Sequence, residues 1–172
     1  LEEYIRQRKP VVLALNTQSS VASELIDLRV ACHPVRLLAD CETHCQLPQP
    51  LITPASMLPD DVKKALAGKT LYDFGLQVAA DTFEFETSRC TLPTSLVIAY
   101  ALAVATSGEA SEVLMAGFDG YSAGDPRNNE MDCLLAAYRR HPQARPLTAV
   151  TPCIYNIKGT SIYGLCAGLD AQ

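Results

Sequence analysis

Two neighbouring stretches decide the fold: Leu92–Gly108, LPTSLVIAYALAVATSG, and Glu112–Gly120, EVLMAGFDG. Apolar residues fill nearly every position of the first stretch, with Thr94 or Ser95 near its start and Gly108 at its end. This pattern predicts a helix that is buried on all sides. The second stretch opens with an apolar run, which predicts a central strand. A buried helix that leads into a buried strand is typical of α/β proteins.

The same alternation of strand and helix continues in both directions along the chain. Apolar runs predict strands at 11–16, 28–32, 50–53, 70–78 and 146–152, and TFEFET at 82–87 predicts an edge strand or hairpin arm. Helices are expected up to Ile26 and at 33–45, 59–66 and 128–141. We therefore predict an α/β fold, a three-layer Rossmann-like domain with a mostly parallel sheet.

Length and composition suit one globular domain of ordinary size. The chain has 172 residues, of which 48% are hydrophobic and 19% charged, so it can bury a core. We expect a single domain over 10–172. Residues 1–9, LEEYIRQRK, lack an initiator Met and predict a helical linker from a missing N-terminal part.

Charge and cysteine usage restrict the classes of partner. The net charge is −5 and the basic residues are scattered, so we expect no nucleic acid partner. The longest apolar stretch, Leu96–Ala105, is too short for a membrane span. An odd count of seven cysteines without a secretory signal predicts reduced thiols and a cytoplasmic location.

Ligands of open α/β sheets bind beyond the carboxyl ends of the strands, at the point where the strand order reverses. This rule selects the loops 16–20, 32–33, 53–56, 91–95, 117–121 and 151–155. Their polar and glycine residues are the predicted ligand-binding set: Asn16, Thr94, Ser95, Gly117, Asp119, Tyr121 and Thr151.

Each of these motifs has a functional and a structural interpretation. Gly117 lets a ligand approach the backbone, and Asp119 can accept a hydrogen bond from a sugar hydroxyl or brace its own turn. Thr94 and Ser95 open a helix, where they either face a phosphate or act as plain caps. Neither a P-loop nor a GxGxxG pattern is present.

The sequence predicts no metal site. One cluster contains Cys32, His33, Cys41, His44 and Cys45, but its C-x3-C spacing has no second pair, so buried thiols are the better interpretation. The acidic residues after the predicted strand at 112–120 indicate a solvated loop that leads into a helix rather than a magnesium site: Asp119, Asp125, Glu130 and Asp132.

No residue stands out as catalytic. His33 follows a strand and precedes Pro34, where it suits a general base, a phosphate contact or a polar helix start. The carboxylates Asp119, Asp125 and Glu130 are the other candidates. A serine-hydrolase elbow, paired glycosidase carboxylates and an HExxH motif are all missing.

Three runs carry a family resemblance: 90–121, CTLPTSLVIAYALAVATSGEASEVLMAGFDGY; 129–140, NEMDCLLAAYRR; and 146–164, PLTAVTPCIYNIKGTSIYG. They resemble the C-terminal Rossmann-like domain of HMG-CoA lyase-like proteins, of the 4-hydroxy-2-oxovalerate aldolase type, from bacterial surface-polysaccharide (lipopolysaccharide) biosynthesis. The resemblance covers nearly the whole chain. It implies an accessory domain whose partner is the N-terminal aldolase-like domain of the parent chain, with the aldolase chemistry in that partner.

The same runs are distantly similar to the bacterial CMP-sialic-acid-dependent sialyltransferases. That similarity implies a CMP-type nucleotide site at Asn16, Thr94, Ser95, Gly117 and Asp119. The enzymes carry a catalytic histidine in the loop that corresponds to 122–131, and SAGDPRNNEM has none. Because glycosyl transfer needs a general base, Asp125 or Glu130 would have to serve.

Three hypotheses follow from the sequence. The first is a domain that binds a nucleotide sugar or phosphorylated sugar, with no other cofactor. The second is a sialyltransferase-like glycosyltransferase with a carboxylate base. The third is a non-catalytic homo-oligomerisation module that pairs through the edge at 82–87.

Overall fold

Four parallel strands pair in the order β1-β2-β3-β4 in the computed structural model, which describes residues 1–167. They are β1 (Leu13–Leu15), β2 (Leu28–Val30), β3 (Leu51–Thr53) and β4 (Leu71–Asp73). A second parallel sheet has the order β10-β9-β8, from β8 (Val113–Met115), β9 (Leu147–Ala149) and β10 (Lys158–Gly159). The third sheet joins β5 (Gly75–Val78) to β7 (Arg89–Leu92), with β6 (Glu84–Phe85) antiparallel at its edge.

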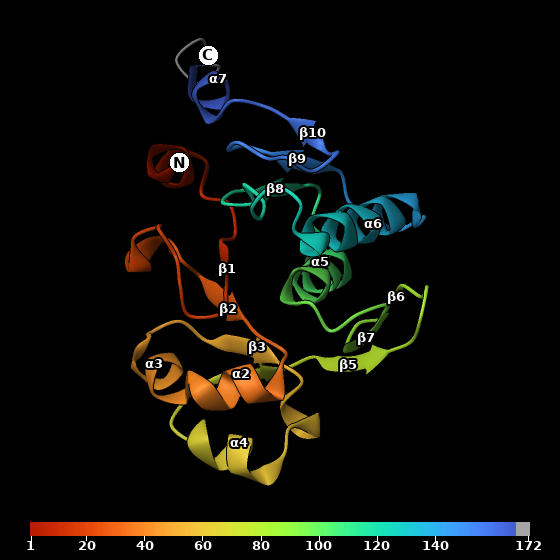
Figure 1. Ribbon diagram of the computed structural model, residues 1–172. Helices are drawn as coiled ribbons and strands as arrows, with labels where there is room; N and C mark the ends of the chain where they lie inside the picture. The colour runs from red at the N-terminus through yellow and green to blue at the C-terminus, as the bar shows by residue number, and fades with distance from the viewer. Residues whose placement is uncertain (168–172) are drawn as a thin grey trace.

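Helices lie on both sides of these strands (Figure 1). The α-helices of the described chain are α1 (Glu2–Arg8), α2 (Pro34–Ala39), α3 (Cys41–Gln46), α4 (Asp60–Ala65), α5 (Val97–Ser107), α6 (Pro126–Arg140) and α7 (Ile162–Ala167). Short 3-10 turns, η1 (Ser23–Leu25) and η2 (Ala55–Met57), follow β1 and β3. The predicted α/β, three-layer Rossmann-like fold is confirmed.

Side-chain alternation along the strands explains the layers. On β2 and β3, Val30 and Ile52 enter the core that contains α5, α6 and the strands β7 to β9. Their neighbours Ala31 and Leu51 point the other way and pack with α2 and α4. Each buried strand therefore carries apolar residues on both faces, as expected for a parallel sheet covered by helices.

The central helix α5 is buried as predicted, but it begins later than expected. It starts at Val97, and Leu96 occupies its N-cap position without a side-chain cap. Thr94 and Ser95 lie in the loop before the helix, so the prediction that one of them caps it is wrong. Along α5, Tyr100 is fully buried and donates a hydrogen bond to the carbonyl oxygen of Phe74. Burial raises the pKa of this phenol.

Several predicted elements are divided in the structure. The strand at 70–78 becomes β4 and β5, because the chain changes partner from β3 to β7 at Phe74. The helix at 33–45 becomes α2 and α3, separated at Asp40, where φ is −103° and ψ is 14°. Strand β7 forms in a stretch where no strand was predicted.

The edge strand predicted at 82–87 is shorter than expected, and its aromatic residues face inward. Only Glu84 and Phe85 pair with β7. The rings of Phe83 and Phe85 both lie 5.9 Å from the ring of Tyr138 on α6. Phe85 also meets the ring of His141 at 4.8 Å. This edge therefore uses its aromatic side chains in the core.

Helix α1 packs against α7 and η1. Ile5 of α1 is buried, and the Glu2 carboxylate accepts a hydrogen bond from the Ala22 backbone N–H at 2.9 Å. None of the helices in residues 1–167 is both long and apolar enough to cross a membrane.

Candidate functional site

A hollow of about 360 Å³ opens where β1 and β8 end and α5 begins. We call it the β1–β8 hollow. β1 is the first strand of the four-stranded sheet, and β8 is the first strand of the β8-β9-β10 sheet. The hollow lies beyond the carboxyl ends of both strands, which is where ligands of open α/β sheets bind. Its walls are formed by Leu15, Asn16, Leu96, Val97, Ile98, Gly117, Phe118, Asp119, Gly120, Tyr121, Met131 and Tyr155.

Asn16 forms the β1 side of the hollow. Its φ of 54° lies in the left-handed region, which asparagine tolerates better than most residues. Its backbone N–H donates to the carbonyl oxygen of Val30 at 2.9 Å. The turn after β1 is therefore fixed at the point where Asn16 lines the hollow.

Arg29 forms hydrogen bonds with the backbone of this turn. Its side chain is buried, with 2% exposure, and its Nη1 donates to the carbonyl oxygens of Asn16 and Thr17, each at 3.0 Å. Its Nε donates to Oε1 of Gln49 at 3.0 Å, and Gln49 Nε2 donates in turn to the carbonyl oxygen of Ser23 at 2.6 Å. Burial lowers the pKa of Arg29. The network satisfies a buried guanidinium with neutral acceptors.

Gly117 and Gly120 shape the β8 side. Gly117 has a φ of 76°, and its N–H donates to Oγ1 of Thr151 at 2.9 Å. Gly120 has a φ of 104°, and a Cβ at this position would lie 2.2 Å from Cδ1 of Ile154. Both glycines are thus required by the backbone path. Thr151, predicted to bind ligand, lies outside the described walls of the hollow and braces Gly117.

Asn128 on α6 forms hydrogen bonds with the rest of the loop after β8, a role that sequence analysis missed. Its Oδ1 accepts from the Tyr121 N–H at 2.8 Å and from the Tyr155 hydroxyl at 3.4 Å. Its Nδ2 donates to the carbonyl oxygens of Tyr121 and Ser122. The Arg127 guanidinium lies 4.0 Å from the centre of the Tyr121 ring. An asparagine in the first turn of a helix, close after a glycine loop, is the signal that could have identified it.

The start of α5 forms the third side. Leu96, Val97 and Ile98 line the hollow, and no side chain caps the helix. The first N–H groups of a helix have no partner within the helix, and they attract anions. Thr94 and Ser95 are not among the described lining residues. The structure therefore brings the first residues of α5 to the hollow, in place of the two residues with the predicted hydroxyls.

Among the proposed catalytic residues, Asp119 alone lines the hollow. Asp125 caps α6, where its carboxylate accepts from the Arg127 N–H at 2.9 Å and from the guanidinium at 2.6 Å. These hydrogen bonds lower the pKa of Asp125 to about 2, so this carboxylate is a weak base. Glu130 and His33 are exposed and lie outside the described walls.

The cysteine and histidine cluster does not assemble in the structure. Cys32 is buried with its thiol 3.3 Å from the carbonyl oxygen of Ser95, and burial raises its pKa to about 12. His44 is fully buried and Cys45 is exposed. Within residues 1–167, no group of three or more His, Cys, Asp or Glu side chains is arranged to hold a metal ion.

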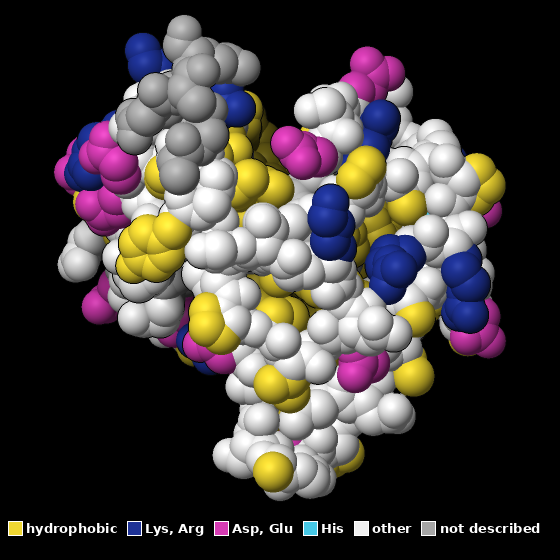
Figure 2. Space-filling model, turned by 90° about the horizontal axis from the view of Figure 1, so that it is seen from above, with side chains coloured by type: hydrophobic (Ala, Val, Ile, Leu, Met, Phe, Trp, Pro, Cys, Tyr) yellow, Lys and Arg dark blue, Asp and Glu magenta, His cyan; other side chains and the backbone are white. Residues whose placement is uncertain are grey.

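The hollow combines an acidic, an amide and an aromatic lining with an uncapped helix start. Viewed from the end that carries α7, the surface of the molecule has basic and acidic side chains interspersed (Figure 2). Comparison of the chain with protein-family models, curated proteins and solved structures finds no match.

Proposed function

We propose that this domain binds a nucleotide sugar or a phosphorylated sugar in the β1–β8 hollow. The proposal rests on one observation: the end of β1, the start of α5 and the loop after β8 surround a single hollow of about 360 Å³. That volume falls within the range of small-molecule sites. The resemblance to nucleotide-sugar enzymes at Asn16, Gly117 and Asp119 supports the same ligand class.

Each wall suits one part of such a ligand. The Asp119 carboxylate accepts hydrogen bonds from ribose or sugar hydroxyls, and the Asn16 amide both donates and accepts. The phosphate is directed toward the first N–H groups of α5. The rings of Phe118 and Tyr121 offer flat apolar surface to a base or a sugar face.

We assign binding rather than sugar transfer to the hollow. Of the proposed bases only Asp119 faces it, while Asp125 is engaged as a helix cap. In this proposal the chain is an accessory domain of a bacterial aldolase- or lyase-type protein of surface-polysaccharide biosynthesis. The aldolase-like partner domain of the parent chain would then carry the lyase chemistry.

Thermal unfolding with CMP, CMP-sugars, UDP-sugars and sugar phosphates tests the proposal. A ligand at ten times its dissociation constant raises the free energy of unfolding by about 1.4 kcal/mol. For a chain of this size that corresponds to about 3–6 °C in the melting temperature. Stabilisation by at least one of these compounds is expected, and no stabilisation at millimolar concentrations by any of them contradicts the proposal.

Variants of the hollow then locate the site. Asp119→Asn and Asn16→Ala are expected to reduce the shift. The matched control Asp60→Asn changes an exposed carboxylate on α4, outside the hollow, and should leave the shift unchanged. An equal loss in Asp60→Asn would place the ligand elsewhere.

A further inference from the structure

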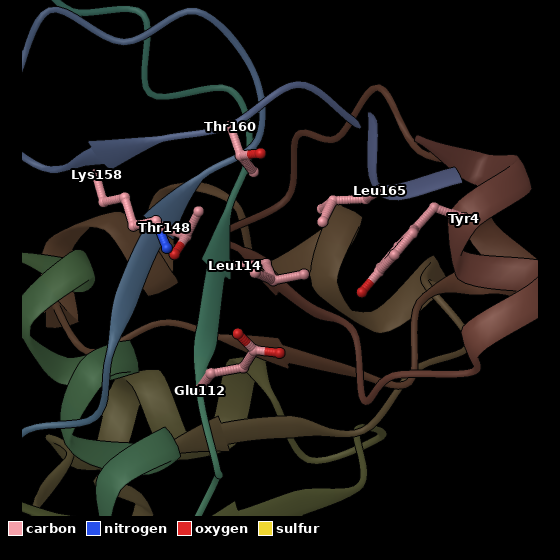
Figure 3. A pocket seen from close by; sticks show the side chains of 7 residues that line it. All are labelled: Tyr4, Glu112, Leu114, Thr148, Lys158, Thr160 and Leu165. Atoms are coloured by element: carbon pink, nitrogen blue, oxygen red, sulfur yellow. The ribbon is translucent and has the colours of Figure 1, made fainter. Parts of the chain in front are cut away.

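A second, smaller groove of about 130 Å³ lies on the β8-β9-β10 sheet, and we call it the β9 groove. Its walls are formed by Tyr4, Glu112, Leu114, Thr148, Lys158, Thr160 and Leu165 (Figure 3). Tyr4 comes from α1 and Leu165 from α7, while the other residues lie in or beside the strands. The β9 groove shares no lining residue with the β1–β8 hollow.

The strand register explains why these side chains converge. Leu114 is paired with Thr148, and Thr148 with Lys158, so the three form one row across the sheet. Glu112 and Thr160 lie two residues from members of this row, and alternation puts them on the same face. Met115, one residue from Leu114, packs into the core with α5 and α6, so the groove is on the opposite face of the sheet.

The polar groups of the groove have no partner within the described chain. No hydrogen bond or ion pair within residues 1–167 engages the side chains of Glu112, Lys158, Thr148, Thr160 or Tyr4. Glu112 and Lys158 are separated by two strand spacings across the sheet and two residues along it. This offset places their Cα atoms about 12 Å apart. Figure 3 shows the two charged side chains at different ends of the groove, with hydroxyl groups between and beside them.

We propose that the β9 groove binds a small zwitterion of the α-amino acid class. The ligand carboxylate meets the Lys158 ammonium and the hydroxyls of Thr148 and Thr160. The ligand ammonium meets the Glu112 carboxylate, with the Tyr4 hydroxyl beside it. A molecule that carries both charges forms a charge-assisted hydrogen bond at each end, whereas a simple anion or cation forms one at a single end.

The size of the groove limits the ligand to a compact amino acid. A cavity of about 150 Å³ accommodates benzene, so 130 Å³ fits a ligand with few heavy atoms. Leu114 and Leu165 provide the apolar contact for a short side chain. L-alanine is therefore the probe that matches both the charges and the volume.

Three related probes separate recognition of a zwitterion from general charge attraction. L-alanine carries both charges, L-alaninamide only the ammonium and N-acetyl-L-alanine only the carboxylate. NMR titrations up to about 10 mM should show chemical-shift changes that saturate with L-alanine. The dissociation constants of the other two probes should be at least tenfold higher, because each of them loses one charge-assisted hydrogen bond. No saturation with L-alanine, or equal affinity for all three probes, overturns the proposal.

Variants test which residue recognises which charge. Lys158→Met should bind L-alanine and L-alaninamide alike, and Glu112→Gln should bind L-alanine and N-acetyl-L-alanine alike. Both positions are exposed, so folding should be retained, and Lys64→Met on α4 is the matched control with unchanged binding. If Lys158→Met keeps the wild-type preference, the assignment is wrong. These outcomes do not depend on nucleotide binding at the β1–β8 hollow, which the same variants should leave intact.

Discussion

The guanidinium of Arg29 donates a hydrogen bond to the carbonyl oxygen of Asn16 at 3.0 Å, and so joins a buried position on β2 to the wall of the β1–β8 hollow. The same Nη1 reaches the next carbonyl, of Thr17, at the same distance. A single side chain therefore fixes two successive peptide groups of the turn after β1. This contact links the packing of the core to the geometry of the proposed ligand site.

Arg29→Met should loosen that turn. The substitution leaves the carbonyl oxygens of Asn16 and Thr17 and the amide oxygen of Gln49 without their donor, at a cost of about 2 kcal/mol in the free energy of unfolding. Hydrogen exchange in peptides that span 16–23 should accelerate more than in β8. The control Arg36→Met breaks an exposed ion pair with Asp40 and should cost less than about 1 kcal/mol. Unchanged exchange at 16–23 in Arg29→Met would contradict this role.

Thr151→Val should weaken nucleotide or sugar-phosphate binding without contact to the ligand. The valine cannot accept the hydrogen bond from the Gly117 N–H, so the start of the β8 loop loses its brace. The loss of one such bond, about 1 kcal/mol, corresponds to roughly fivefold in the dissociation constant. Thr151→Ser keeps the hydroxyl and should restore binding, as measured by calorimetry. Equal affinities of the valine and serine variants would show that the hydroxyl is not needed.

The sequence predicted the layers and the location of the hollow, because both depend on local patterns. The apolar runs around Ile98 and Leu114 determine the order of helix and strand, and the strand-end rule then selects Asn16, Gly117, Asp119 and Tyr121, which do lie together. These residues could be chosen without knowledge of any long-range contact.

The missed features depend on contacts between distant segments. The chain changes sheets at Phe74, where its N–H bonds to Thr53 and the next residue bonds to Ser88, and local sequence cannot specify such partners. Arg29 and Asn128 were overlooked for the same reason. An arginine within an apolar strand only interrupts the apolar pattern, and its role is not evident until its acceptors on other segments are known. Asn128 has the pattern of an ordinary residue at a helix start.

Gly120→Ala should reduce ligand affinity, whereas Gly124→Ala should not. Both glycines have positive φ, 104° and 82°, so either alanine costs about 1 kcal/mol or more in strain. A Cβ at 120 also displaces the Ile154 side chain beside the hollow, but a Cβ at 124 meets nothing within 4 Å. Thermal unfolding should show losses for both variants and calorimetry a loss of affinity for Gly120→Ala alone. A parallel loss of affinity in Gly124→Ala would mean that loop strain, rather than the wall at 120, controls binding.

Asp125 should make the stability of the α6 start depend on pH in the acid range. Its folded pKa, about 2, lies below its ordinary value of 3.8, so the stabilisation is complete above pH 3.8 and is lost as pH falls through 2. Asp125→Asn keeps a capping side chain but loses the charged pair with Arg127. The wild type should therefore be more stable than Asp125→Asn at pH 5, and the difference should shrink steadily from pH 4 to pH 2. Chemical denaturation across this range measures it. Arg127→Met should reduce the same pH-dependent difference without abolishing it, because the backbone N–H of residue 127 still donates to the carboxylate. A gap between wild type and Asp125→Asn that stays constant from pH 5 to pH 2 would contradict the ionic role of this cap.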